Sequence, residues 1–166
     1  MTLGEAAAEA EALAAAGDEK ALATLRSQWD DELEMAARDP DFRVRAQAYR
    51  AIAQFRFRQK TELLRRGLED DSPACRGSAL VALESLSRDH PGVVNQVRPK
   101  LHSLANADGN AAVRRLAILC LKNASAQPDT IRLLKGLADD DEQDRELRDA
   151  AGKVAELLRK KSGAPR

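Results

Sequence analysis

A short pattern, an apolar residue followed by Arg and, three residues later, by Ala, occurs four times in this chain and constrains its fold more than any other feature. The apolar anchors are Val44, Cys75, Val113 and Leu147, so successive copies begin 31, 38 and 34 residues apart. In every copy the residues at +4, +7, +8 and +11 from the anchor are also apolar. Because this spacing follows the 3.6-residue turn of an α-helix, it predicts four equivalent helices, each with one buried apolar stripe.

Weaker helical patterns separate these copies and supply their packing partners. Pro91 and Pro128 stand where a helix can begin, because the first turn needs no N–H from proline. Pro99 falls inside such a segment, where we expect it to kink the helix. The predicted partner segments are residues 18–37, 57–69, 91–106 and 128–138.

An acidic residue precedes the Arg of each copy by six positions. These residues are Asp39, Asp70, Asp108 and Glu142. We expect them in the turn that opens each helix, where a carboxylate accepts backbone N–H groups. We also expect each Arg to reach the acid of an adjoining repeat and thereby to fix the register of stacking.

Helix pairs with an Asp and Arg at the turn, an Ala-rich second helix and a proline in a first helix resemble HEAT repeats, most closely over residues 93–124. The resemblance covers about residues 18–160 and implies an all-α fold. We expect a right-handed α-solenoid of about four antiparallel helix pairs. Tetratricopeptide repeats fit less well, because their period is nearly constant and their Trp, Gly and Tyr signature is absent. The predicted pairs are residues 18–56, 57–87, 91–125 and 128–160.

The two ends of the chain have their own patterns. Residues 1–17 predict an N-terminal capping helix, since Thr2 and Glu5 have the spacing of a capping box and a solenoid needs polar caps. A helix that docks a partner is the alternative for this segment. Residues 161–166 are expected to form a flexible tail.

Composition supports the helical class and locates the charge. Apolar residues make up 43% of the 166 residues and aromatic residues 3%, which suits closely packed helices, and hairpin turns are not indicated. Residues 1–41 carry 3 basic and 11 acidic side chains, whereas residues 42–66 carry 8 basic side chains and one acid. This basic block either attracts phosphates or acidic proteins or neutralises the acidic N-terminal helices. Its basic members are Arg43, Arg45, Arg50, Arg56, Arg58, Lys60, Arg65 and Arg66.

A search for catalytic chemistry finds no candidate set. His90 and His102 have no second ligand at the spacing of a zinc site. Cys75 and Cys120 occupy stripe positions, so we expect buried apolar roles for them. We therefore predict no enzyme activity, no metal, no cofactor and no small-molecule substrate. With no secretory signal and no apolar run of about 20 residues, a cytoplasmic protein outside the membrane is expected.

The face opposite the stripe, at +2, +6 and +9 from each anchor, is the candidate binding surface. HEAT-like solenoids generally bind partners on the face lined by their second helices. Val81 and Leu119 both occupy +6, and we predict that they form an apolar centre for an acidic-apolar segment or helix of another protein. The alternative is that these two residues bury each other. The basic residues expected around that centre are Arg50, Arg115 and Lys122.

These features predict a protein–protein interaction module, an adaptor or scaffold. The alternative function is nucleic-acid binding through the basic 42–66 segment with Arg115 and Lys122, which would weaken steeply with salt.

Overall fold

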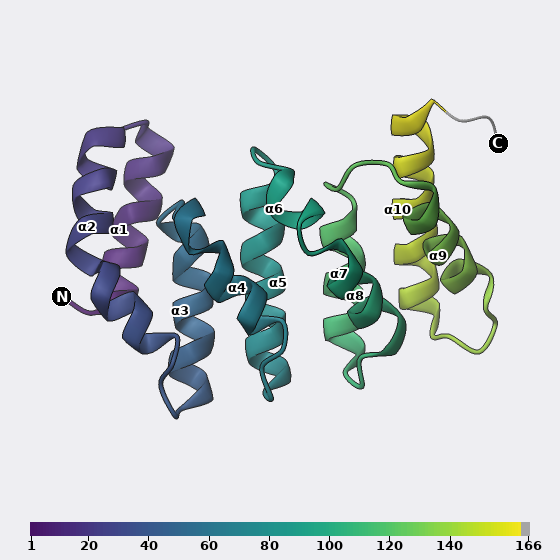
Figure 1. Ribbon diagram of the computed structural model, residues 1–166, viewed down its shortest axis with the longest axis horizontal. Helices are drawn as coiled ribbons and strands as arrows, with labels where there is room; N and C mark the ends of the chain where they lie inside the picture. The colour runs from purple at the N-terminus through teal and green to yellow at the C-terminus, as the bar shows by residue number, and fades with distance from the viewer. Residues whose placement is uncertain (164–166) are drawn as a thin grey trace. The chain divides into compact units, whose positions relative to one another are not determined.

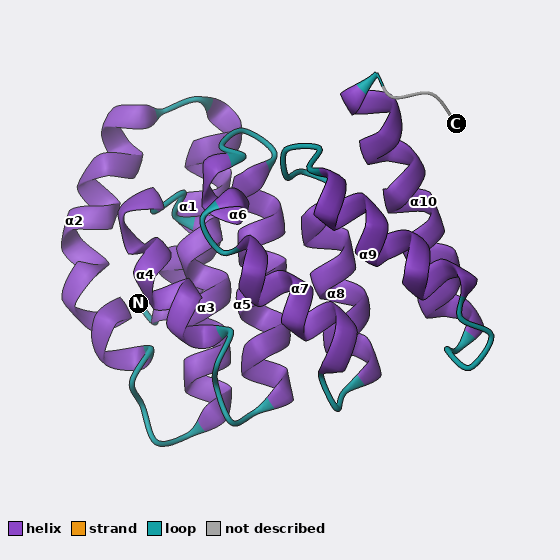
Figure 2. Ribbon diagram, turned by 45° about the vertical axis from the view of Figure 1, so that its right-hand side comes forward, coloured by secondary structure: helices purple, strands orange, loops and turns teal. Residues whose placement is uncertain are grey.

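A computed structural model describes residues 1–163, and every regular element in that range is a helix (Figures 1 and 2). The predicted all-α class and α-solenoid fold are confirmed. The chain divides into two compact units, Met1–Leu86 and Ser87–Arg166, which we call unit 1 and unit 2. No helix in the described range is long and apolar enough to cross a bilayer. The helices there are α1 (Leu3–Ala16), α2 (Glu19–Ala36), α3 (Phe42–Gln54), the 3-10 helix η1 (Arg58–Lys60), α4 (Thr61–Gly67), α5 (Pro73–Ser87), α6 (Gly92–Asn95), α7 (Arg98–Ala107), α8 (Ala111–Leu121), α9 (Pro128–Asp139) and α10 (Arg145–Ser162).

In unit 1, α1 packs against α2 and α3, and α2 packs against α3. The predicted capping box is present: the Thr2 N–H donates to a Glu5 carboxylate oxygen at 2.7 Å, and the Glu5 N–H donates to the Thr2 hydroxyl at 3.2 Å. Gly17 ends α1 with φ of 73°, a left-handed conformation that glycine adopts without steric cost. Asp18 then caps α2 by accepting from the N–H of Ala21.

The predicted apolar stripe is buried in all four copies, so each stripe helix contributes one continuous edge of the core. Small side chains dominate it, which lets neighbouring helices approach closely. Its sixteen residues are Ala48, Ala51, Ile52, Phe55, Ala79, Ala82, Leu83, Leu86, Ala117, Cys120, Leu121, Ala124, Ala151, Val154, Ala155 and Leu158.

The opposite face of α3 differs from the prediction. Ala46 and Ala53, at +2 and +9, were expected to point outward, but both are buried. The reason is α1, which packs against α3. Helix α3 is therefore packed against other helices on part of the face opposite its stripe as well as on the stripe. Its +6 residue, Arg50, stays exposed.

In unit 2, α7 packs against α8, and α10 packs against both α8 and α9. The segment 91–106 breaks into α6 and α7, so the predicted kink at Pro99 is wrong. Pro99 lies in the first turn of α7, where its missing N–H breaks no helical hydrogen bond. Pro128 begins α9 as predicted.

The C-terminal helix extends past its predicted end. Lys161 and Ser162, assigned to a flexible tail from the sequence, still belong to α10, and Gly163 caps it with φ of 71°. The Lys161 ammonium donates to the carbonyls of Lys122 and Ala124 at 3.2 and 3.0 Å. The remaining tail residues, 164–166, lie outside the described residues.

Two glycines inside helices provide a test of this close packing. A Cβ added at Gly67 would lie 2.9 Å from the Cβ of Ala79 and 3.1 Å from the ring of Tyr49, whereas a Cβ at Gly136 would meet nothing within 4 Å. We expect Gly67→Ala to destabilise the protein by about 1–3 kcal/mol through overpacking. Gly136→Ala should stabilise it by about 0.5–1 kcal/mol, because alanine has the higher helix propensity. Chemical denaturation followed by circular dichroism measures both, and a stabilising Gly67→Ala would contradict the packing.

Candidate partner-binding surface

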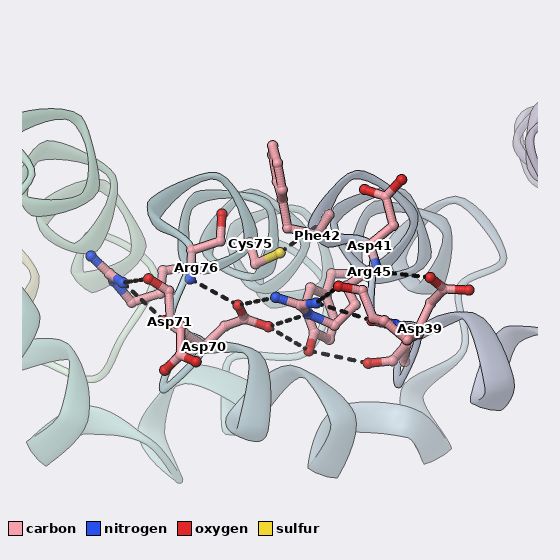
Figure 3. A network of polar contacts seen from close by, with 12 residues as sticks. Asp39, Asp41, Phe42, Arg45, Asp70, Asp71, Cys75 and Arg76 are labelled. Carbon is pink, nitrogen blue, oxygen red and sulfur yellow. Dashed lines mark hydrogen bonds and ion pairs between the residues drawn. The ribbon is translucent and has the colours of Figure 1, made fainter.

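An ion pair between Arg45 of α3 and Asp70 in the loop before α5 connects neighbouring elements of unit 1 (Figure 3). The Nε and Nη2 atoms of Arg45 donate to the two carboxylate oxygens of Asp70, each at 2.9 Å. Nη1 of Arg45 donates to the backbone carbonyls of Asp39 and Pro40 at 3.0 and 3.1 Å. One guanidinium therefore ties the loop before α3 to the loop before α5, as predicted for the Arg of one repeat and the acid of the next.

Asp70 is the centre of this network. Its carboxylate also accepts the Ser72 N–H at 2.9 Å and the Tyr49 hydroxyl at 3.4 Å. Burial by itself would raise the pKa of Asp70, but the hydrogen bonds from Arg45 and Ser72 outweigh it and hold the pKa below its ordinary value. Burial likewise raises the pKa of the nearby Cys75 thiol, which contacts the Phe42 carbonyl at 3.1 Å.

The repeated acid accepts a backbone N–H two residues later in each loop, as expected for the turn that opens a helix. Asp39, Asp70 and Asp108 do so for Asp41, Ser72 and Asn110. In the fourth loop, however, Asp140 accepts the N–H of Glu142, so the prediction of Glu142 as the acid is wrong. That acid stands eight residues before its Arg instead of six, because two more residues separate it from the start of its helix.

Arg114 in unit 2 shows the consequence of that shift. Its Nη1 atom donates to the Gln143 side-chain oxygen at 2.9 Å and its Nε atom to the Ala105 carbonyl at 2.9 Å. The partner in the adjoining loop is thus a neutral amide where the sequence predicted a carboxylate.

Much of the basic 42–66 block is paired with acids inside unit 1. Arg43 pairs with Asp41 and Arg65 with Glu62. Lys60 pairs with Asp30 and Glu34 of the acidic helix α2, and its ammonium also lies 5.3 Å from the centre of the Phe57 ring. The guanidinium groups of Arg50, Arg56 and Arg66 have no ion pair or hydrogen bond among the described residues.

The side chains of α1, α3 and α5 enclose a hollow of about 260 Å³ on the surface of unit 1. It contains two of the sequence-predicted site residues, Arg50 and Val81, and Val81 is 46% exposed. Arg56 lines it as well, although the sequence assigned that residue only to the basic block. One sequence signal could have identified Arg56. It lies between Phe55 and Phe57 just after the predicted helix, where no glycine is present to end that helix. Glu11, Ala53 and Ser85 also line the hollow.

The other three predicted site residues belong to unit 2. Arg115 and Leu119 lie one turn apart on α8, and Lys122 follows as its C-cap residue. Leu119 is 39% exposed, and Arg115 contacts Glu146 at 3.4 Å. That these residues act on one partner together with Arg50 and Val81 is a prediction.

The histidine and cysteine side chains have structural partners. The His102 ring nitrogen Nε2 lies 2.8 Å from the buried Thr130 hydroxyl, and burial lowers the pKa of His102. Cys75 and Cys120 are buried, as predicted for stripe positions. Across the described part of the chain, no three His, Cys, Asp or Glu side chains come together as a metal site would require.

Comparison with known protein families finds HEAT repeats over residues 31–98. This range runs from the second half of α2 to the first residue of α7 and includes the Arg45–Asp70 network. Comparison with curated proteins gave no match.

Replacing the central carboxylate tests the network. Asp70→Asn leaves the partly buried Arg45 guanidinium without a counter-charge, so we expect a loss of about 2–3 kcal/mol in the stability of unit 1. The fluorescence of Trp29, the single tryptophan of the chain, reports unfolding of unit 1. Asp129→Asn is the matched control, since Asp129 and its partner Arg132 are 84% and 78% exposed and such pairs contribute about 0–1 kcal/mol.

The same variant has a distinct pH dependence. Because the pKa of Asp70 is lowered in the folded state, the contribution of this carboxylate is complete above its unfolded pKa of about 3.9 and is lost as pH falls through the folded pKa. The stability difference between wild type and Asp70→Asn should therefore narrow below about pH 4. A difference that stays constant through the acid range would contradict this assignment.

Proposed function

We propose that this chain, whose residues 31–98 match HEAT repeats, is a protein-binding module of the adaptor or scaffold type. HEAT repeats are generally protein-interaction scaffolds, and their fold is typically non-enzymatic. Stacked helical repeats present an extended surface on which a partner can lie. The partner is bound, in this proposal, on the exposed face of the second helices and undergoes no reaction there.

The observation that carries the proposal is the half-exposed Val81 beside an unpaired Arg50 in the unit 1 hollow. An apolar side chain next to a guanidinium suits a protein segment that combines apolar and acidic residues. Leu119 is likewise exposed one turn from Arg115 on α8, with Lys122 as the C-cap residue, and we include these three residues in the proposed surface.

Nucleic-acid binding is the less favoured function, because the ion pairs of the basic block reduce its attraction for phosphates. Arg45, Lys60 and Arg65 each have a carboxylate partner within unit 1. A protein that binds a polyanion mainly by counterion release needs many such side chains free. The pairing of Lys60 with α2 instead supports the view that the block neutralises the acidic N-terminal helices.

A double variant tests the surface. Val81→Asp with Leu119→Asp places a charge at each exposed apolar position, so we expect at least a tenfold loss of co-purifying protein from a nuclease-treated lysate of the native host. Quantitative mass spectrometry of the captured chains measures it. Helicity should not change, because both side chains are exposed in the free protein.

Met35→Asp is the matched control, since Met35 is an apolar residue with 74% exposure on α2, outside the proposed surface. It should capture the partner as wild type does. Equal capture by the double variant and this control would refute the proposed surface. Recovery of nucleic acid in place of protein when nuclease is omitted would favour the alternative function.

A further inference from the structure

Arg56 has a backbone conformation that its residue type disfavours. Its φ is +52°, and it is the single non-glycine residue with positive φ among residues 1–163. This left-handed conformation brings the Cβ of an L-residue close to its own backbone, and helices that end this way usually have glycine there. Glycine at this position would adopt the same backbone conformation with a lower conformational free energy.

The surrounding structure holds Arg56 in this conformation. The Phe57 N–H donates to the Ile52 carbonyl at 2.9 Å, and the Arg56 N–H donates to the Ala53 carbonyl at 3.0 Å, the two bonds of a Schellman motif. Phe55 and Phe57 on either side are both buried. The turn is therefore required by burial of the two phenylalanines, and it directs the side chain of residue 56 away from the core.

The α2 helix adds a further restraint. Nε of Arg26 donates to the Phe55 carbonyl at 2.7 Å, so the last residue before the turn is fixed from outside α3. Disfavoured backbone conformations persist where the fold over-determines them, and they are enriched at binding sites.

The Arg56 guanidinium itself is exposed and has no partner among the described residues, although it lines the same hollow as Arg50 and Val81. Arg50 is equally exposed and equally unpaired. The one acid of the hollow, Glu11, accepts a hydrogen bond from the Gln54 side chain at 3.4 Å. The hollow thus combines two free guanidinium groups, one engaged carboxylate and apolar lining residues that include Val81 and Ala53.

We propose that Arg56 and Arg50 bind the carboxylates of an acidic peptide segment whose central apolar side chain packs on Val81. The inference rests on the proposed protein-binding function and specifies the chemistry of the partner at this hollow. Charge complementarity favours an acidic segment, and a guanidinium binds a carboxylate through two parallel hydrogen bonds. This recognition would account for the arginine at a position whose backbone favours glycine.

The test is an NMR titration of the full chain with an acetylated and amidated pentapeptide, a leucine between two pairs of glutamates. At low ionic strength, where charge pairs are least screened, we expect saturable shifts of the Val81 and Ala53 methyl signals and the Arg56 Nε–H signal. The same peptide with glutamine in place of glutamate should give none. The absence of saturable shifts at millimolar glutamate peptide would overturn the proposal.

Arg56→Gly separates recognition from folding. It should weaken the peptide by roughly tenfold or more, as expected for loss of a charge-assisted hydrogen bond. It should also raise the unfolding midpoint by roughly 2–4 °C, because the conformational strain is relieved. Weaker binding by a more stable protein cannot result from misfolding. Arg56→Lys keeps the strain and the charge but not the planar pair of donors, so it should bind with intermediate affinity at an unchanged midpoint.

Arg66→Ala is the matched control, since Arg66 is an exposed and unpaired arginine of unit 1 that does not line this hollow. It should leave the peptide affinity unchanged within about twofold. If Arg56→Gly binds the peptide as wild type does, the assignment of Arg56 is overturned, while loss of the captured protein in the Val81 and Leu119 variant would still support the proposed function. Tighter binding of a single-stranded oligonucleotide or of anionic vesicles at the same methyl groups would overturn the acidic peptide as occupant.

Discussion

Close contact between helices through small side chains is the constraint on which the rest of the structure depends. Half of the sixteen buried stripe residues are alanines, and Gly67 lies so near α5 that even a methyl group there would collide with Ala79. Helices with such smooth surfaces gain contact area from closeness rather than from large interlocking side chains. Smooth surfaces specify the register between neighbours only weakly, so register must come from elsewhere.

We infer that the loops supply it. The Arg45–Asp70 pair is bidentate, and Arg45 also donates to backbone carbonyls of the loop before α3, so the pair has one favourable geometry. We infer that a partly buried pair of this kind contributes more to specificity of arrangement than to net stability, because desolvation offsets most of the attraction. The ion pair of Lys60 with Glu34 of α2 restrains the position of that N-terminal helix in the same way. The unpaired arginines near the end of α3 stand apart from these structural pairs.

The sequence was sufficient to predict the parts of the structure that repeat. Four stripes, the start of α9 at Pro128, the N-cap Thr2 of α1 and the contact of Arg45 with Asp70 all follow from spacing, since periodic burial and capping depend on local sequence. The errors fall where one copy departs from the others. Pro99 was expected to kink a helix but lies in the first turn of one, and Asp140 replaces Glu142 because the acid of that loop stands two residues farther from its helix. Burial of Ala46 and Ala53 could not be predicted, because it depends on where α1 packs.

That packing also decides where unit 1 can bind. With Ala6, Ala7 and Ala10 buried, α1 packs against α3 and covers part of the face that the sequence assigned to a partner. What remains open on α3 and α5 is the hollow, which Arg50, Val81 and Arg56 line. Helix α1 therefore both adds to the core and confines the exposed apolar surface of α3 and α5 to a region bordered by guanidinium groups. A purely apolar partner would leave those groups without a counter-charge, whereas an acidic-apolar segment satisfies both parts of the hollow, and this favours selective binding over general adhesion.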